Sequence, residues 1–157
     1  VISHFVDPAL ILQLVERLGK MGCKSIVVLE SGSILDHFYQ HRSVAEVADY
    51  IGIQPRQHAQ FEIRDASQDQ VHHEYPRGLG QQFISKTWMD ADFRITFGKM
   101  CSCPVGLVHL TLENLEGLGS RSDDFFFVER LANREAALMT VADECPPHLA
   151  LLDAYNS

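Results

Sequence analysis

Apolar residues recur at helical intervals near the start of the chain and then give way to a strand-like run. Asp7 and Pro8 form a helix start, because an aspartate can cap the first backbone amides and proline already has a helical φ. Apolar positions follow at intervals of three and four until Gly22, which predicts a one-sided helix lying on a sheet. Residues 25–29 (SIVVL) are short, apolar and β-branched, as in a parallel strand covered on both faces.

The next segment contains a second, shorter helix pattern. Residues 34–41 show no clear period, and we expect a loop there. Ser43 and Glu46 stand at capping-box spacing ahead of several apolar residues, and Gly52 closes this segment. The pattern predicts a short helix with a well-defined start and end.

An antiparallel hairpin at the edge of the sheet is predicted after this helix. Residues 61–64 alternate between apolar and charged side chains, which indicates a half-exposed strand. Residues 71–75 are expected to be its hairpin partner. Residues 82–85 form a further candidate strand, and residues 86–89 are expected to be a brief linker to the central strand.

The central pattern combines a buried strand, a polar turn and a helix. Residues 93–97 carry apolar, β-prone side chains at alternate positions, which predicts a strand that emerges at Gly98. The polar turn KMCSC follows at residues 99–103. Pro104 is well placed in the first turn of a helix whose apolar positions continue until Gly117.

The last part of the chain contains an aromatic run, a helix and a final strand. Phe125, Phe126 and Phe127 are consecutive, and they are either core filler in a partly buried segment or an exposed patch for a partner. Residues 133–142 show a helical pattern, and residues 149–152 form a short apolar strand that ends at the following aspartate.

Helices that alternate with nearly continuous apolar strands predict an α/β fold. We expect a mainly parallel sheet flanked by helices in three layers, with a small antiparallel edge hairpin. Residues 1–157 are predicted to form a single α/β domain, which could be a fragment of a longer chain because it begins with Val1 rather than methionine. Ligands of such sheets bind beyond the carboxyl ends of the strands. Three polar strand exits, at residues 30–33, 98–103 and 153–155, are therefore expected to line one crevice.

The net charge of the chain makes some classes of binding partner unfavourable. A formal net charge of -8 without a Lys/Arg cluster disfavours nucleic acid and anionic membranes as partners. No apolar run approaches the roughly 20 residues that a membrane-spanning helix needs, and no signal peptide is recognisable, so a cytoplasmic protein is expected. Four irregularly spaced cysteines do not resemble a secreted disulfide framework, and they are expected to be reduced.

Lys99 is the strongest candidate for a binding residue, because it lies at a strand exit just before a predicted helix start. A lysine there could join backbone amides in binding a small anionic molecule, or act in proton transfer or imine formation. The alternative is an ordinary solvated lysine. The candidate ligand-binding residues are Lys99, Ser102, Asn114, Ser31 and Gly32, and the candidate catalytic residues are Lys99, Asp153 and Glu30.

Cys101 and Cys103 form a C-x-C pair, in which the alternation of an extended chain can put both sulfurs on one side. Two thiolates could hold a soft metal such as zinc or copper, with His109 as a third ligand and a fourth from elsewhere, for which His148 and Cys145 are candidates. The alternative is a pair of small residues packed in a tight turn. No iron–sulfur cluster is expected within this chain, because it lacks a C-x-x-C run.

The chain resembles the family known as domain of unknown function 362 over most of its length. The resemblance is carried by four motifs, which here read DAD at residues 90–92, KMCSC at 99–103, ENLEG at 113–117 and ALLDA at 150–154. The chain matches the family's motifs at Lys99, Ser102, Asn114, Gly117 and Asp153. It departs from them at Cys101, Cys103 and Glu113, where the family usually has lysine, histidine and lysine.

This resemblance implies an α/β fold and a redox-linked role, because members of the family often carry a ferredoxin-like iron–sulfur domain. An iron–sulfur or redox partner domain is therefore expected. Our first functional hypothesis is a module that binds a small anionic ligand or cofactor around Lys99. The alternatives are a metalloenzyme that uses Cys101, Cys103 and a histidine, and a non-catalytic half-domain. That half-domain would pair through Phe125, Phe126 and Phe127 with another chain, for example in a homo-oligomer, or with the remainder of its own polypeptide.

Overall fold

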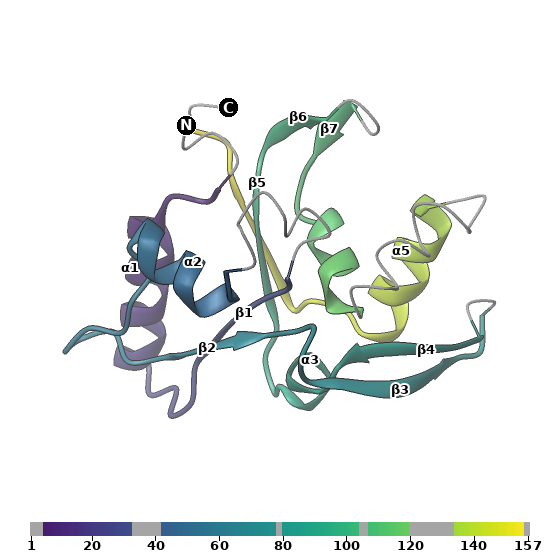
Figure 1. Ribbon diagram of the computed structural model, residues 1–157, viewed down its shortest axis with the longest axis horizontal. Helices are drawn as coiled ribbons and strands as arrows, with labels where there is room; N and C mark the ends of the chain where they lie inside the picture. The colour runs from purple at the N-terminus through teal and green to yellow at the C-terminus, as the bar shows by residue number, and fades with distance from the viewer. Residues whose placement is uncertain (1–4, 33–41, 78–79, 104–106, 120–133, 156–157) are drawn as a thin grey trace.

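The computed structural model describes residues 5–32, 42–77, 80–103, 107–119 and 134–155 (Figure 1). Its helices are α1 (Pro8–Lys20), α2 (Val44–Ile51), α3 (Lys86–Asp90), the 3-10 helix η2 (Glu113–Leu118) and α5 (Arg134–Glu144). Its strands are β1 (Val27–Glu30), β2 (Glu62–Asp65), β3 (Gln70–Tyr75), β4 (Gly80–Ser85), β5 (Ile95–Lys99), β6 (Cys101–Cys103), β7 (Leu107–His109) and β8 (Leu149–Asp153). The mixture of parallel strand pairs, antiparallel hairpins and helices confirms the α/β class.

The local signals at the ends of α1 and α2 are confirmed. The Asp7 carboxylate accepts a hydrogen bond from the backbone N–H of Ala9, and Pro8 follows in the first turn of α1. Ser43 and Glu46 form the complete capping box of α2, and Gly52 ends this helix in the left-handed conformation, with φ 90°. Both helix starts are fixed by contacts within a few residues of each other.

The predicted edge hairpin is present, but its strands are not the expected pair. Strand β2 pairs in parallel with β1, whereas β3 pairs antiparallel with β4. The expectation that residues 61–64 pair with residues 71–75 is therefore wrong. The predicted linker is also wrong, because α3 occupies that segment and Ser85 caps it with a hydrogen bond from the N–H of Trp88.

The second parallel pair joins β5 to β8, with Ile95 opposite Leu149 and Lys99 opposite Asp153. Figure 1 shows α1 and α2 on one side of this pair and η2 and α5 on the other. Each of the four ladders has two strands in the part of the chain that the structure describes. This parallel pair agrees with the mainly parallel strands that the sequence predicts, although the sequence does not specify which strands are neighbours.

The segment after the central strand differs most from the prediction. The prediction of a helix over residues 104–117 is wrong, because β6 and β7 pair antiparallel and, of the described residues in this segment, only those of the 3-10 helix Glu113–Leu118 are helical. Apolar residues at 107, 108 and 110 fit a helix or a strand equally well, and the pairing with residues 101–103 decides in favour of the strand. His109 therefore lies in a strand and not on a helix.

The main core lies where α5, η2 and the β3–β4 hairpin meet. Its buried members are Tyr75, Ile84, Trp88, Leu115, Leu118, Ala137, Leu138, Val141 and Cys145. Trp88 donates a hydrogen bond from Nε1 to the backbone oxygen of Cys145 over 2.9 Å, which satisfies the polar edge of this buried ring. The aromatic run at residues 125–127 lies outside the described residues. None of the described helices has the length and apolar character needed to span a membrane.

Candidate functional site

Of the three strand exits that were predicted to line one crevice, those of β5 and β8 are neighbours, whereas the exit of β1 lies beside the end of β2. Lys99 and Asp153 are register partners at the carboxyl ends of β5 and β8. Glu30 has Asp65 as its register partner at the ends of β1 and β2. The 3-10 helix η2 lies against β5 and against Ser31, the residue that follows β1. Its Asn114 donates from Nδ2 to the Phe97 oxygen over 2.9 Å, and a Cβ on its Gly117 would lie 2.6 Å from the Ser31 hydroxyl.

The Lys99 side chain is largely shielded from solvent, and its ammonium group already has partners within the protein. Its Nζ lies 3.0 Å from Oδ2 of Asp153 and 2.5 Å from the backbone oxygen of Tyr155. The two side chains are 9% and 2% exposed, so this is a nearly buried ion pair. A small anion could therefore bind to Lys99 only in competition with Asp153.

Asp153 accepts more hydrogen bonds than the one from Lys99. Its Oδ2 also accepts from the backbone N–H of Asp7 over 3.1 Å, and its Oδ1 accepts from the N–H of Tyr155 over 3.1 Å. Desolvation disfavours the charged carboxylate, but the hydrogen bonds from Lys99, Asp7 and Tyr155 outweigh it and lower the pKa of Asp153. A carboxylate held in this way is a structural anchor and a poor proton acceptor.

Asn114 and Gly98 bring η2 and the segment before it against β5. Asn114 Nδ2 also contacts Thr96 Oγ1 at 3.3 Å, and Thr96 Oγ1 donates to the Thr111 oxygen over 3.0 Å. At Gly98 a Cβ would lie 2.8 Å from the backbone oxygen of Leu110, so only glycine fits there without a shift. The side-chain amide of Asn114, which was predicted to bind a ligand, thus forms hydrogen bonds that hold η2 against β5.

The end of β1 is more exposed to solvent than Lys99 and Asp153 are. The Glu30 residue is exposed, and its Oε1 accepts a hydrogen bond from the Ser31 N–H over 2.9 Å. Desolvation by the surrounding protein raises the pKa of Glu30, and the negative charge of Asp65 raises it further. Gly32 donates its N–H to Oδ1 of Asp65 over 3.3 Å, so the backbone after β1 is tied to β2.

The β6–β7 hairpin brings together the residues predicted to bind a metal. Cys101 is the register partner of His109, and Cys103 is the partner of Leu107. Opposite residues of an antiparallel pair lie on the same face, and so do residues two apart along one strand. Positions 101, 103 and 109 therefore share one face of the hairpin, while Ser102 lies on the other face with Val108.

Within the part of the chain whose side chains are described, no three His, Cys, Asp or Glu side chains gather to hold a metal ion. The side chains of residues 102–109 lie outside it, so the placement of the hairpin residues rests on the backbone register. Cys101 is half-buried and has a free thiol.

Two residues considered as a fourth ligand have other roles. Cys145 is fully buried, and its Sγ contacts Sδ of Met89 at 3.1 Å. Burial raises the pKa of this thiol, which disfavours the thiolate that a metal needs. His148 accepts a hydrogen bond at Nδ1 from the Arg94 N–H over 2.9 Å and stacks on Phe93. The described structure therefore gives no sign of a fourth ligand from these positions.

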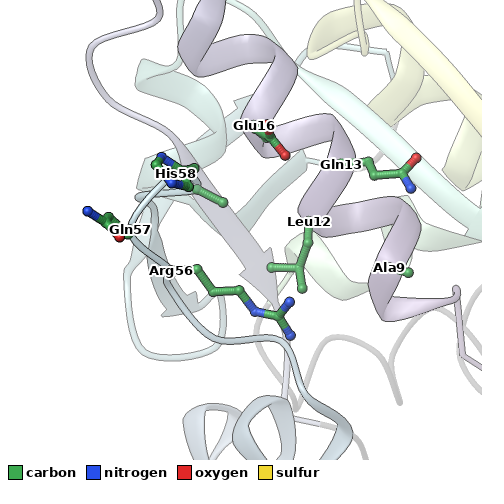
Figure 2. A pocket seen from close by; sticks show the side chains of 8 residues that line it. Ala9, Leu12, Gln13, Glu16, Arg56, Gln57 and His58 are labelled. Atoms are coloured by element: carbon green, nitrogen blue, oxygen red, sulfur yellow. The ribbon is translucent and has the colours of Figure 1, made fainter.

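A groove beside α1 was not predicted from the sequence. It has a volume of about 380 Å³ and is lined by α1 and by the segment that follows α2, with Ala9, Leu12, Gln13, Glu16, Arg56, Gln57, His58 and Ala59 (Figure 2). The run of polar residues from 56 to 58 matches no motif. The sequence marks this segment only as a group of hydrogen-bonding side chains between a helix and a strand.

Comparison with protein families gives one match over nearly the whole chain. The family model described as domain of unknown function (DUF362) matches residues 3–157. No curated protein and no solved structure gives a match. The family match agrees with the motifs at Lys99, Asn114 and Asp153, all of which lie on or beside the β5–β8 pair. The chain belongs to the family of domain of unknown function 362.

Proposed function

We propose that this protein binds a soft metal ion, with Zn²⁺ as the first candidate, through Cys101, Cys103 and His109 on one face of the β6–β7 hairpin. The observation that carries the proposal is the register that sets Cys101 opposite His109. Thiolate and imidazole are ligands that suit zinc, and the two-residue spacing of the cysteines keeps them on the same face. Each ligand comes from the same short hairpin, so the site needs no distant residue for its first three bonds.

Three protein ligands leave one position of a tetrahedral zinc site open. Sites of this kind bind water or a substrate atom at the fourth position, whereas closed four-ligand sites are structural. A metal in this hairpin would therefore polarise a carbonyl group or activate a bound water. This chemistry is the metalloenzyme alternative, and the general acid or base would be a group other than the anchored Asp153.

The geometry favours this role over anion binding by Lys99. The Lys99 amine already has a carboxylate and a backbone oxygen as partners, and Asn114 is hydrogen-bonded to β5. An anion at Lys99, a redox-linked partner domain and assembly through the phenylalanine run stay predictions. The open coordination position is a natural place for a small anionic ligand to bind, directly on the metal rather than on the lysine.

Metal content and cobalt spectroscopy test the proposal. Protein loaded with Zn²⁺ and then dialysed is expected to retain about one ion per chain, as dedicated sites do. The Co²⁺-loaded protein is expected to show a sulfur-to-metal charge-transfer band. Cys101→Ser and Cys103→Ser should each remove both signals, and His109→Gln should weaken retention.

Cys23→Ser is the matched control, because Cys23 is an exposed free cysteine outside the hairpin. It should retain the ion as the unmodified protein does. Retention of less than roughly a tenth of an ion per chain in the unmodified protein would contradict the proposal. Equal loss of the cobalt band in Cys23→Ser and Cys101→Ser would do the same.

A further inference from the structure

The groove beside α1 has the volume of a small-molecule site. Its volume of about 380 Å³ lies within the usual range of ligand clefts, which is roughly 300–1,000 Å³. Leu12 and Ala59 are only 8% and 6% exposed, and they provide apolar surface within the groove. Figure 2 shows the Leu12 side chain pointing from α1 toward the Arg56 guanidinium, with His58 across from Glu16.

Arg56 supplies the groove with a guanidinium group that is available to bind a ligand. None of the described residues forms a hydrogen bond or an ion pair with its guanidinium. Its backbone is fixed, because Arg56 and Ala59 form a two-way bridge with N to O distances of 3.0 and 2.9 Å. A guanidinium on a fixed backbone presents parallel donors that match the oxygens of a carboxylate or a phosphate.

The remaining charges do not oppose an anion at Arg56. Glu16 is the acidic residue of the groove, and its Oε1 lies 2.5 Å from Nζ of Lys20. That hydrogen bond and the positive charge of Lys20 lower the pKa of Glu16, so its negative charge is compensated locally. In a chain with a net charge of -8, the groove thus sets a guanidinium that has no partner among the described residues beside apolar side chains.

We propose that this groove binds a small organic anion, with its carboxylate or phosphate group on Arg56 and its apolar part on Leu12 and Ala59. Gln57 and His58 also line the groove, and the His58 imidazole, which lies across from Glu16 in Figure 2, would contact a polar group of that ligand. This site is separate from the metal-binding hairpin, and neither proposal depends on the other.

Titrations of isotope-labelled protein, followed by NMR, test the site. The probes are inorganic phosphate, acetate and butyrate, each at constant ionic strength. The amide signals of Leu12, Arg56 and His58 are expected to shift and saturate. Butyrate should bind more tightly than acetate, because its chain can bury against the floor. Saturation by butyrate alone identifies a carboxylate ligand, and saturation by phosphate alone identifies a phosphate ligand.

Arg56→Gln should weaken the binding of the saturating probe about tenfold, which is the loss expected for a charged hydrogen bond. Arg17→Gln is the matched control, since Arg17 is an exposed arginine of α1 outside the groove, and it should leave binding unchanged. Arg56→Lys keeps the positive charge but loses the planar guanidinium, so its affinity for the probe should lie between those of Arg56→Gln and Arg17→Gln. Shifts that stay linear for all three probes would overturn the proposal. Equal weakening by Arg17→Gln and Arg56→Gln would also overturn it, because it would show only a diffuse effect of charge.

Discussion

The Lys99 ammonium group and the Asp153 carboxylate form an ion pair of 3.0 Å at the ends of two parallel strands, with only 9% and 2% of the side chains exposed. The same carboxylate also accepts hydrogen bonds from the backbone N–H groups of Asp7, which caps α1, and Tyr155, which follows β8. One charge pair thus ties the start of the first helix to the end of the last strand. Its main role is to hold these segments together.

Removing one partner of this pair should destabilise the fold strongly. Asp153→Asn leaves the Lys99 ammonium group buried without its counter-charge, and such losses typically cost about 3–5 kcal/mol. Urea unfolding followed by the fluorescence of Trp88, the single tryptophan, measures the change in free energy of unfolding. The control is Asp90→Asn, which breaks the exposed Lys86–Asp90 pair and should cost less than about 1 kcal/mol. Equal effects of the two substitutions would contradict the role given to Asp153.

The contribution of Asp153 should depend on pH in a defined direction. Its pKa is lower in the folded protein than in the unfolded chain, because Lys99 and two backbone N–H groups favour the charged form. The stabilisation is therefore complete above the unfolded pKa, about 4 for an aspartate, and is lost as pH falls through the folded pKa.

Unfolding measurements of the unmodified protein and of Asp153→Asn between roughly pH 7 and pH 3 isolate this contribution from that of the other carboxylates. The difference between the two free energies of unfolding should be largest near neutral pH and should shrink toward acid. A difference that stays constant over this range would mean that the carboxylate is not held in its charged form.

The sequence predicts those parts of the fold that depend on neighbouring residues. Asp7 and Ser43 cap their helices through contacts two and three residues away, and both starts are confirmed. Pairing between distant segments was less predictable. Alternation marked residues 61–64 as a strand, close to the observed β2, but nothing local indicated that β1, and not β3, would be its partner. The apolar run around residue 108 fitted a helix until its pairing with β6 was known.

In the candidate site, too, the positions of single residues were predictable from their neighbours, whereas contacts between distant residues were not. The position of Lys99 at a strand exit followed from the alternation of the preceding residues. Its partner lies 54 residues away, so the sequence placed both residues at strand ends without showing that they neutralise each other. Arg56 was missed because it has neither a motif nor a periodic neighbourhood. The role proposed for Arg56 depends on the apolar surface of α1 beside it, which only the folded chain reveals.

Gly98 tests how closely the segment before η2 is packed on β5. A Cβ at this position would lie 2.8 Å from the Leu110 oxygen and 3.0 Å from Cα of Thr111, and both contacts are with backbone. Gly98→Ala should therefore destabilise the protein by about 1–3 kcal/mol, the usual cost of overpacking. Gly19 in α1 is the control, because a Cβ added there would meet no described atom within 4 Å. Gly19→Ala should stabilise the protein by up to about 1 kcal/mol through helix propensity. Unfolding in urea measures both variants. A gain in stability for Gly98→Ala would mean that residues 110 and 111 do not lie against β5.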